Sequence, residues 1–214
     1  MWSIFRKLVG LIFYPDVCVY CGALGSLLCS NCYEAIEWSL LPPKLDINQP
    51  IASLEVVSMY NGPIKSLIQK LKFYGVIDVA QVGAELMYQS LNLPKVDCLV
   101  PVPMHPKRLS QRGYNQTYLL AKALGKIMDT PVANILLRTE YGLSQVEKIS
   151  RPQRTQVLTR QFVINPSLQT SKLPKSVLLI DDVVTTGTTL SACVKALQTA
   201  GISVVHVATL AHGY

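Results

Sequence analysis

The chain has 214 residues, of which 50% are hydrophobic and 15% are charged, and its formal net charge is +7. This composition excludes a disordered chain and is sufficient for one hydrophobic core with a small appended module. The excess of positive charge favours polyanionic partners, either nucleic acid or phosphorylated ligands.

The N-terminal stretch combines Arg6 and Lys7 with a short apolar run, Leu8–Tyr14. No small-residue cleavage site follows the run, and a bilayer span needs ~20 apolar residues. We expect an amphipathic helix that lies on the protein, with a peripheral membrane contact as the alternative. The prediction is therefore a cytoplasmic protein without a transmembrane segment, with the inner face of the membrane as a further location.

Four of the six cysteines form two closely spaced CxxC motifs, Cys18/Cys21 and Cys29/Cys32. Four thiolates in tetrahedral geometry suit zinc, and a site closed by four protein ligands folds a module rather than catalyses. A disulfide pair or a redox CxxC motif is the alternative, but neither accounts for two motifs in tandem. Cys98 and Cys193 stand alone in apolar surroundings, which indicates buried packing.

Prolines in Leu40–Pro50 predict a linker between a first module, residues 1–45, and a main domain, residues 46–214. Residues 51–60 have the pattern of a strand. Asn61-Gly62-Pro63 then predicts a helix start, and Gly75 ends that helix. Its apolar face is expected to consist of Ile64, Leu67, Ile68 and Leu71, with a second helix from Val79 to about Leu91.

Asp97–Pro103 predicts a buried strand, and a loop rich in hydrogen-bond donors follows it. The loop offers His105, Lys107, Arg108, Arg112, Asn115 and Gln116. No acidic residue occurs between Asp97 and Asp129, so the loop suits a pyrophosphate or a nucleic-acid backbone. A solvated positive loop is the alternative, and His105 by itself is interpreted as a turn residue or hydrogen-bond donor rather than a base.

The next helix should bury Leu120, Ala123, Leu124 and Ile127. Short strands are expected at Asn134–Leu137 and Phe162–Ile164. The long basic connection between them, Arg138 to Gln161, predicts a flexible flap over the site. Ser203–Leu210 predicts the last buried strand, with His206 in the core and His212 nearer the site.

The segment Val177–Gly201 carries the strongest ligand signal. Val177–Ile180 predicts a strand buried on both faces, and Asp181 and Asp182 follow at its carboxyl end. A hydroxyl-rich loop then leads into a helix, whose N-terminus favours an anion such as phosphate. This loop consists of Thr185, Thr186, Gly187, Thr188 and Thr189. The acid pair suits ribose hydroxyls or hydrated magnesium, so a sugar phosphate satisfies both halves; an ordinary β-turn-α unit with an acidic N-cap is the alternative.

Residues Val177–Thr189 resemble the 5-phosphoribosyl-1-pyrophosphate (PRPP) signature of type I phosphoribosyltransferases. The resemblance implies that the catalytic acids Asp181 and Asp182 hold the ribose hydroxyls. It also implies that Thr185–Thr189 hold the 5-phosphate and that Mg²⁺ binds together with PRPP. The signature identifies a ligand site and does not by itself imply catalysis, because regulatory proteins also use this fold.

Several motifs occur together in one order: the four-cysteine finger, LKFYG at Leu71–Gly75, DCLVPVPMHPKRLSQRGYNQ, Gln145 with Arg151 and Arg154, and VLLIDDVVTTGTT. This set resembles the ComF family of competence proteins, which also includes GntX-like proteins. The resemblance implies an α/β fold with a phosphoribosyltransferase-like parallel sheet flanked by helices, behind a small N-terminal zinc finger. In the flap the family pattern is Arg-x-x-Asn, whereas here Arg154 is followed by Thr155, Gln156 and Val157.

The family resemblance implies a cytosolic role in natural transformation, in which incoming single-stranded DNA is handled together with uptake and recombination proteins. Grooves that bind single-stranded nucleic acid combine positive charge with aromatic side chains. Four aromatic residues lie near basic residues in the sequence and could serve in this way, namely Phe73, Tyr74, Tyr114 and Tyr118. Their alternative role is packing in the core. Two other functions remain open. One is an active phosphoribosyltransferase with a nucleobase or nucleic acid as the unidentified acceptor, and the other is a zinc-finger scaffold with a vestigial site.

Overall fold

The computed structural model describes residues 16–39, 47, 49–139, 161–169 and 173–213. The predicted N-terminal helix, most of the linker and the flap residues Gln145, Arg151 and Arg154 lie outside the described residues. No described helix has the length and apolar character that crossing a membrane requires.

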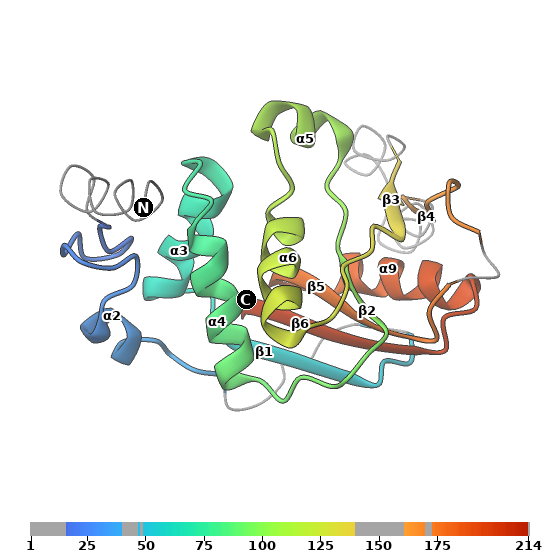
Figure 1. The fold of residues 1–214 in the computed structure, drawn as a ribbon, viewed down its shortest axis with the longest axis horizontal. Helices are drawn as coiled ribbons and strands as arrows, with labels where there is room; N and C mark the ends of the chain where they lie inside the picture. Colours follow the sequence, from blue (N-terminus) through green and yellow to red (C-terminus); the bar gives the residue numbers. More distant parts are fainter. Residues whose placement is uncertain (1–15, 40–46, 48, 140–160, 170–172, 214) are drawn as a thin grey trace, which may run out of the picture.

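Four parallel strands form the central sheet in the order β1-β6-β5-β2 (Figure 1). They are β1 (Ser53–Met59), β2 (Cys98–Pro101), β5 (Ser176–Val184) and β6 (Val204–His212). Leu99 pairs with Leu178, and Ile180 pairs with Ala208. Helices cover both faces of the sheet, which explains why its strands are continuous apolar runs rather than alternating ones. All four predicted strands are confirmed.

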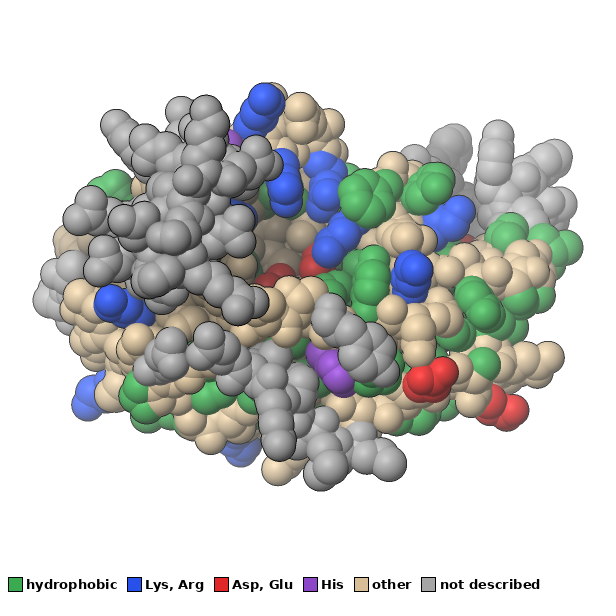
Figure 2. Space-filling model, turned by 180° about the vertical axis from the view of Figure 1, so that it is seen from behind, with side chains coloured by type: hydrophobic (Ala, Val, Ile, Leu, Met, Phe, Trp, Pro, Cys, Tyr) green, Lys and Arg blue, Asp and Glu red, His purple; other side chains and the backbone are tan. Residues whose placement is uncertain are grey.

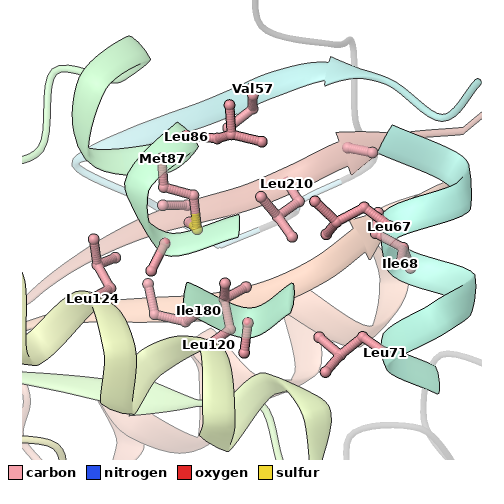
Figure 3. Close-up of a cluster of buried hydrophobic side chains, with 14 of the residues drawn as sticks. Val57, Leu67, Ile68, Leu71, Leu86, Met87, Leu120, Leu124, Ile180 and Leu210 are labelled. Carbon is pink, nitrogen blue, oxygen red and sulfur yellow. The ribbon is translucent and has the colours of Figure 1, made fainter. Parts of the chain in front are cut away.

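One face of the sheet is covered by α3 (Gly62–Phe73), α4 (Val79–Ser90) and α6 (Gln116–Met128). The predicted apolar face of α3 is fully buried, and its Leu67, Ile68 and Leu71 belong to the same hydrophobic cluster as Leu210 and Ile180 of the sheet (Figure 3). The helix ends before Gly75, whose φ of 70° is a conformation that glycine adopts without strain. In α6 Leu120 and Leu124 are buried as expected, and Ala123 and Ile127 are half-buried.

The opposite face is covered by α9 (Thr188–Thr199) and a two-stranded antiparallel sheet, β3 (Leu136–Arg138) with β4 (Phe162–Ile164). β4 has its predicted bounds, whereas β3 begins two residues later than the sequence indicated. Cys193 and Cys98 are buried in this layer. Burial raises the pKa of Cys98 to about 11, so the thiol stays protonated and serves packing, as predicted.

The four-cysteine module precedes the sheet and contains α2 (Ser30–Glu34). Its Ile36 is buried in the same hydrophobic cluster as residues of α3 and α4. A bridge pairs Trp38 with Ser58 of β1, and Asn61 donates a hydrogen bond of 2.7 Å from Nδ2 to Glu37 Oε2. The module is therefore packed against the start of the main domain.

The segment after β2 differs from the sequence prediction. A short helix, α5 (Pro106–Arg112), stands where we expected a loop (Figure 1). His105 is its N-cap, and its Nδ1 accepts the backbone N–H of Lys107 at 3.1 Å, which agrees with the predicted role of a turn residue. Pro106 at the first helical position explains why this polar, proline-containing stretch begins a helix.

Candidate functional site

The site forms where β5 extends past its shorter neighbour β2. Pairing between the two strands ends at Pro101 and Ile180, but β5 continues to Val184 alongside β6. Asp181 and Asp182 therefore lie within the strand and do not follow it, which corrects the sequence interpretation. The chain leaves β2 towards α6 on one face and leaves β5 towards α9 on the other. Such a switch point opens a crevice at the carboxyl ends of parallel strands.

A cavity of about 740 Å³ occupies this crevice and contains acidic and basic side chains together. Figure 2 shows it as a hollow with acidic side chains (red) inside and basic side chains (blue) beside it. The charged and polar residues that line it are Lys72, Arg108, Gln111, Arg112, Asn115, Gln116, Thr117, Arg138, Asp181, Asp182 and Thr189.

The two carboxylates are buried and have different partners. Because side chains alternate along a strand, Asp182 is directed to the α3 side of the sheet and Asp181 to the α9 side. Asp182 Oδ1 forms an ion pair of 2.6 Å with Lys72 Nζ. Asp182 Oδ2 is buried and has no hydrogen-bond partner among the described residues. Asp181 Oδ1 accepts the backbone N–H of Asp182 at 2.9 Å.

Burial raises the pKa of Asp181 to about 7, and the negative charge of Asp182 acts in the same direction. The Asp182 backbone N–H, Lys72 and Arg138 oppose that shift in pKa without cancelling it. The site thus keeps a carboxyl group that titrates near neutral pH, which is a frequent property of functional sites.

Arg112 and Arg138 place guanidinium groups at the cavity. Arg112 donates a hydrogen bond of 2.5 Å from Nη1 to Gln116 Oε1, and its guanidinium carbon lies 5.4 Å from the ring centre of Phe73. Arg138 Nη2 donates to Gln161 Oε1 at 3.1 Å, whereas its buried Nε has no partner among the described residues. Burial lowers the pKa of Arg138, and the nearby charge of Arg108 lowers it further.

Asn115 fixes the N-terminus of α6 against the end of β2. Its Oδ1 accepts the backbone N–H of Thr117 at 3.2 Å, and its Nδ2 donates to the Val102 carbonyl at 3.1 Å. The Thr117 hydroxyl donates to the same carbonyl at 2.6 Å. Asn115 therefore holds the wall of the cavity in position as well as lining it.

The hydroxyl-rich loop lies at the N-terminus of α9. Gly187 is the N-cap with a φ of 81°, and the Thr186 and Thr188 hydroxyls are 2.8 Å apart. Thr185 and Thr186 are exposed. Thr189 is the one member of the predicted loop that lines the cavity.

The structure brings together seven of the predicted site residues in the cavity, namely Asp181, Asp182, Thr189, Arg108, Arg112, Asn115 and Gln116. His105, Lys107, Thr185, Thr186, Gly187 and Thr188 are not among the lining residues. Sequence reasoning missed the roles of Lys72 and Arg138. Lys72 was visible within the LKFYG motif, but no local pattern connects it to an acid so far along the chain.

The four N-terminal cysteines have the arrangement of a metal site. Their Sγ atoms all lie within 4.8 Å of one another, and those of Cys21 and Cys29 are 3.6 Å apart. A tetrahedral site with Zn–S bonds of about 2.3 Å places its sulfurs about 3.8 Å apart. All four thiols are free, so this arrangement favours a metal ion over the disulfide alternative.

The chain is similar in sequence to competence proteins, and part of it matches a phosphoribosyltransferase domain family. Residues 118–213 match the family described as "Phosphoribosyl transferase domain". Competence protein F of Haemophilus influenzae is 31% identical over 209 residues, covering 90% of this chain and 84% of that protein. Competence protein ComFC of Streptococcus pneumoniae is 30% identical, covering 70% of this chain and 63% of that protein. An adenine phosphoribosyltransferase crystal structure aligns with a TM-score of 0.40 and 11% identity over 69% of this chain and 75% of that one.

Proposed function

The chain belongs to the ComF family of competence proteins, and from this premise we propose that it handles incoming single-stranded DNA in natural transformation and binds PRPP with Mg²⁺. We place this activity in the cytoplasm or at the inner face of the membrane, together with DNA-uptake and recombination proteins. The family membership supports the biological role. The observation that carries the ligand assignment is a buried acid pair inside a cavity that also contains arginines.

The proposed ligand has complementary chemistry at each end. Ribose hydroxyls donate hydrogen bonds, and the free Oδ2 of Asp182 and the carboxylate of Asp181 can accept them. Pyrophosphate carries several negative charges, which Arg108, Arg112 and Arg138 can neutralise. The 5-phosphate would lie at the N-terminus of α9, next to Thr189.

The donor set also fits a magnesium ion, because carboxylate oxygens are its preferred protein ligands and one buried oxygen of Asp182 lacks a partner. Asp181 and Asp182 would hold the ion, which would neutralise negative charge on the pyrophosphate. Within the protein itself, Lys72 already places a positive charge beside the Asp182 carboxylate.

A catalytic phosphoribosyltransferase is the second candidate, and the grouping of two buried carboxylates with arginines in one cavity favours it. The acids would orient the ribose, and the arginines would stabilise the charge of the leaving pyrophosphate. The acceptor in that reaction would be a nucleobase or a nucleic acid.

For the N-terminal module we propose a structural zinc ion, held by Cys18, Cys21, Cys29 and Cys32. Four protein ligands leave no open position, so the ion would stabilise the module's fold.

The test is calorimetric titration of PRPP with Mg²⁺ into the wild type and into the double variant Asp181→Asn, Asp182→Asn. Removing two negative charges should favour an anionic ligand by simple electrostatics. Loss of binding would therefore mean that the carboxylates contact the ligand directly or through the metal. Asp78→Asn, at an exposed acid beside α4, is the matched control and should bind as the wild type does.

Retained or stronger binding by the double variant would overturn the site assignment. A wild type that does not bind PRPP would overturn the ligand itself and leave the scaffold interpretation.

A further inference from the structure

Two adjacent aromatic rings, Phe73 and Tyr74, stand exposed at the C-terminal end of α3. Their side chains are 69% and 68% exposed, more than any other aromatic side chain among the described residues. Phe73 also lines the mouth of the cavity. A single exposed apolar residue is ordinary, but two neighbouring exposed rings beside a cavity indicate a surface that binds something planar.

Each ring has a cation on one side. Lys70 Nζ lies 4.5 Å from the ring centre of Tyr74, and the guanidinium of Arg112 lies 5.4 Å from that of Phe73. The large exposed fractions leave the remaining surface of both rings accessible to solvent. A base can therefore stack on the open surface while the neighbouring cation meets a backbone phosphate.

The surroundings of the two rings are positively charged. Two long segments, residues 56–77 and 98–128, contain no Asp or Glu. Their basic residues are Lys65, Lys70, Lys72, Lys107, Arg108, Arg112, Lys122 and Lys126. Figure 2 shows basic side chains grouped beside the hollow, with hydrophobic side chains next to them. This combination is complementary to a polyanion with exposed bases.

We propose that Phe73 and Tyr74, with Lys70 and Arg112, form a stacking platform for single-stranded DNA at the mouth of the cavity. We call these four residues the aromatic ledge. The inference rests on the proposed function, since it takes single-stranded DNA as the partner, and it adds the place where the strand binds. In a duplex the faces of the bases are already stacked on each other, so the ledge should prefer single strands.

Segments of the chain itself do not have the charge that would complement the aromatic ledge. Residues 1–15 carry two basic residues and no acid, and residues 140–160 carry four basic residues against two acids. A second copy also has a net charge of +7. Electrostatic complementarity thus favours single-stranded DNA on the aromatic ledge over these segments or a second copy of the chain.

The experiment is fluorescence anisotropy with a labelled 20-nucleotide oligo-dT and, for comparison, a duplex of the same length. Phe73→Leu and Tyr74→Leu keep an apolar side chain but remove the ring. Stacking is worth about 1–3 kcal/mol per base, so each variant should bind the single strand about tenfold more weakly. Phe73→Trp should bind at least as tightly as the wild type, because the ring is kept.

The matched control is Tyr88→Leu, since Tyr88 is 52% exposed and lies at the far end of α4. It should bind single strands as the wild type does. Lys70→Gln should lower the slope of log affinity against log salt by about 0.7, the value for one phosphate contact on a single strand. Tyr74→Leu should keep its PRPP affinity, because Tyr74 does not line the cavity.

Normal binding by Phe73→Leu and Tyr74→Leu, or an equal loss in Tyr88→Leu, would overturn the aromatic ledge while leaving the proposed function in place. A wild type that binds no single-stranded DNA would overturn both the ledge and the DNA-handling role. Loss of DNA binding with unchanged PRPP binding in Tyr74→Leu would support the ledge, because it would show that the Tyr74 ring serves DNA and not PRPP.

Discussion

Asp181→Asn is expected to stabilise the protein above neutral pH. Burial and the charge of Asp182 raise the pKa of Asp181 from its ordinary value of 3.8 to about 7 in the folded state. Between these two values the folded state binds a proton that the unfolded state has released, so the stability of the wild type falls as pH rises. Each pKa unit corresponds to 1.36 kcal/mol, and roughly three units give about 4 kcal/mol at pH 8. Asparagine avoids this cost and can still accept the Asp182 N–H.

The assay is urea unfolding of both proteins at pH 4 and at pH 8, followed by circular dichroism. The free energies of unfolding should nearly coincide at pH 4, and the variant should exceed the wild type by about 2–4 kcal/mol at pH 8. Asp97→Asn is a control in which the substitution should lower the stability at pH 8 instead of raising it. Backbone and side-chain hydrogen bonds from Ser176 lower the pKa of Asp97, so its contribution is stabilising above its ordinary pKa and is lost as pH falls. An Asp181→Asn variant that is no more stable than the wild type at pH 8 would refute the reasoning.

Three further substitutions test other contacts. Lys72→Met should lower the free energy of unfolding by about 3 kcal/mol, because it leaves the buried Asp182 carboxylate unpaired; adding Asp182→Asn should recover most of this loss in the same urea assay. Cys29→Ser should lose bound zinc and destabilise the N-terminal module, and full metal content by mass spectrometry after dialysis would contradict a closed four-thiolate site. Asn115→Ala should cost about 1–2 kcal/mol in thermal unfolding, since the cap of α6 and the bond to the Val102 carbonyl are lost together.

The sequence predicted most of the fold because the apolar patterns are local and unambiguous. Val177–Ile180 is a short continuous apolar run, as expected for a strand covered on both faces, and Ile64, Leu67, Ile68 and Leu71 recur at helical spacing. Gly75 marked the end of α3 correctly. The helix α5 was missed because it buries none of its residues, so it has no apolar periodicity to detect.

The candidate site was only partly predictable. The acids and Thr189 are neighbours in sequence, and a strand followed by a helix brings them to one edge of the sheet. Lys72 and Arg138 reach the same cavity from other elements, and their positions depend on how α3 and β3 pack on the sheet. Such long-range contacts are set by packing geometry rather than by any periodicity in the chain.

The position of the acids within β5, rather than after it, explains why they differ from each other. A loop after the strand would let both carboxylates turn towards solvent. Inside the strand, side-chain alternation directs Asp182 to Lys72 on one face. On the other face, the Asp182 N–H and the charges of Lys72 and Arg138 lower the pKa of Asp181 but do not cancel the effect of burial. One carboxylate is thus paired with a cation and the other is held near its titration point, although they are adjacent in sequence. The early end of β2 at Pro101 makes both accessible from a single cavity, because β5 then has no neighbouring strand on that side. Extending β2 by two residues would therefore close the cavity, although none of the residues of β5 that line it would change.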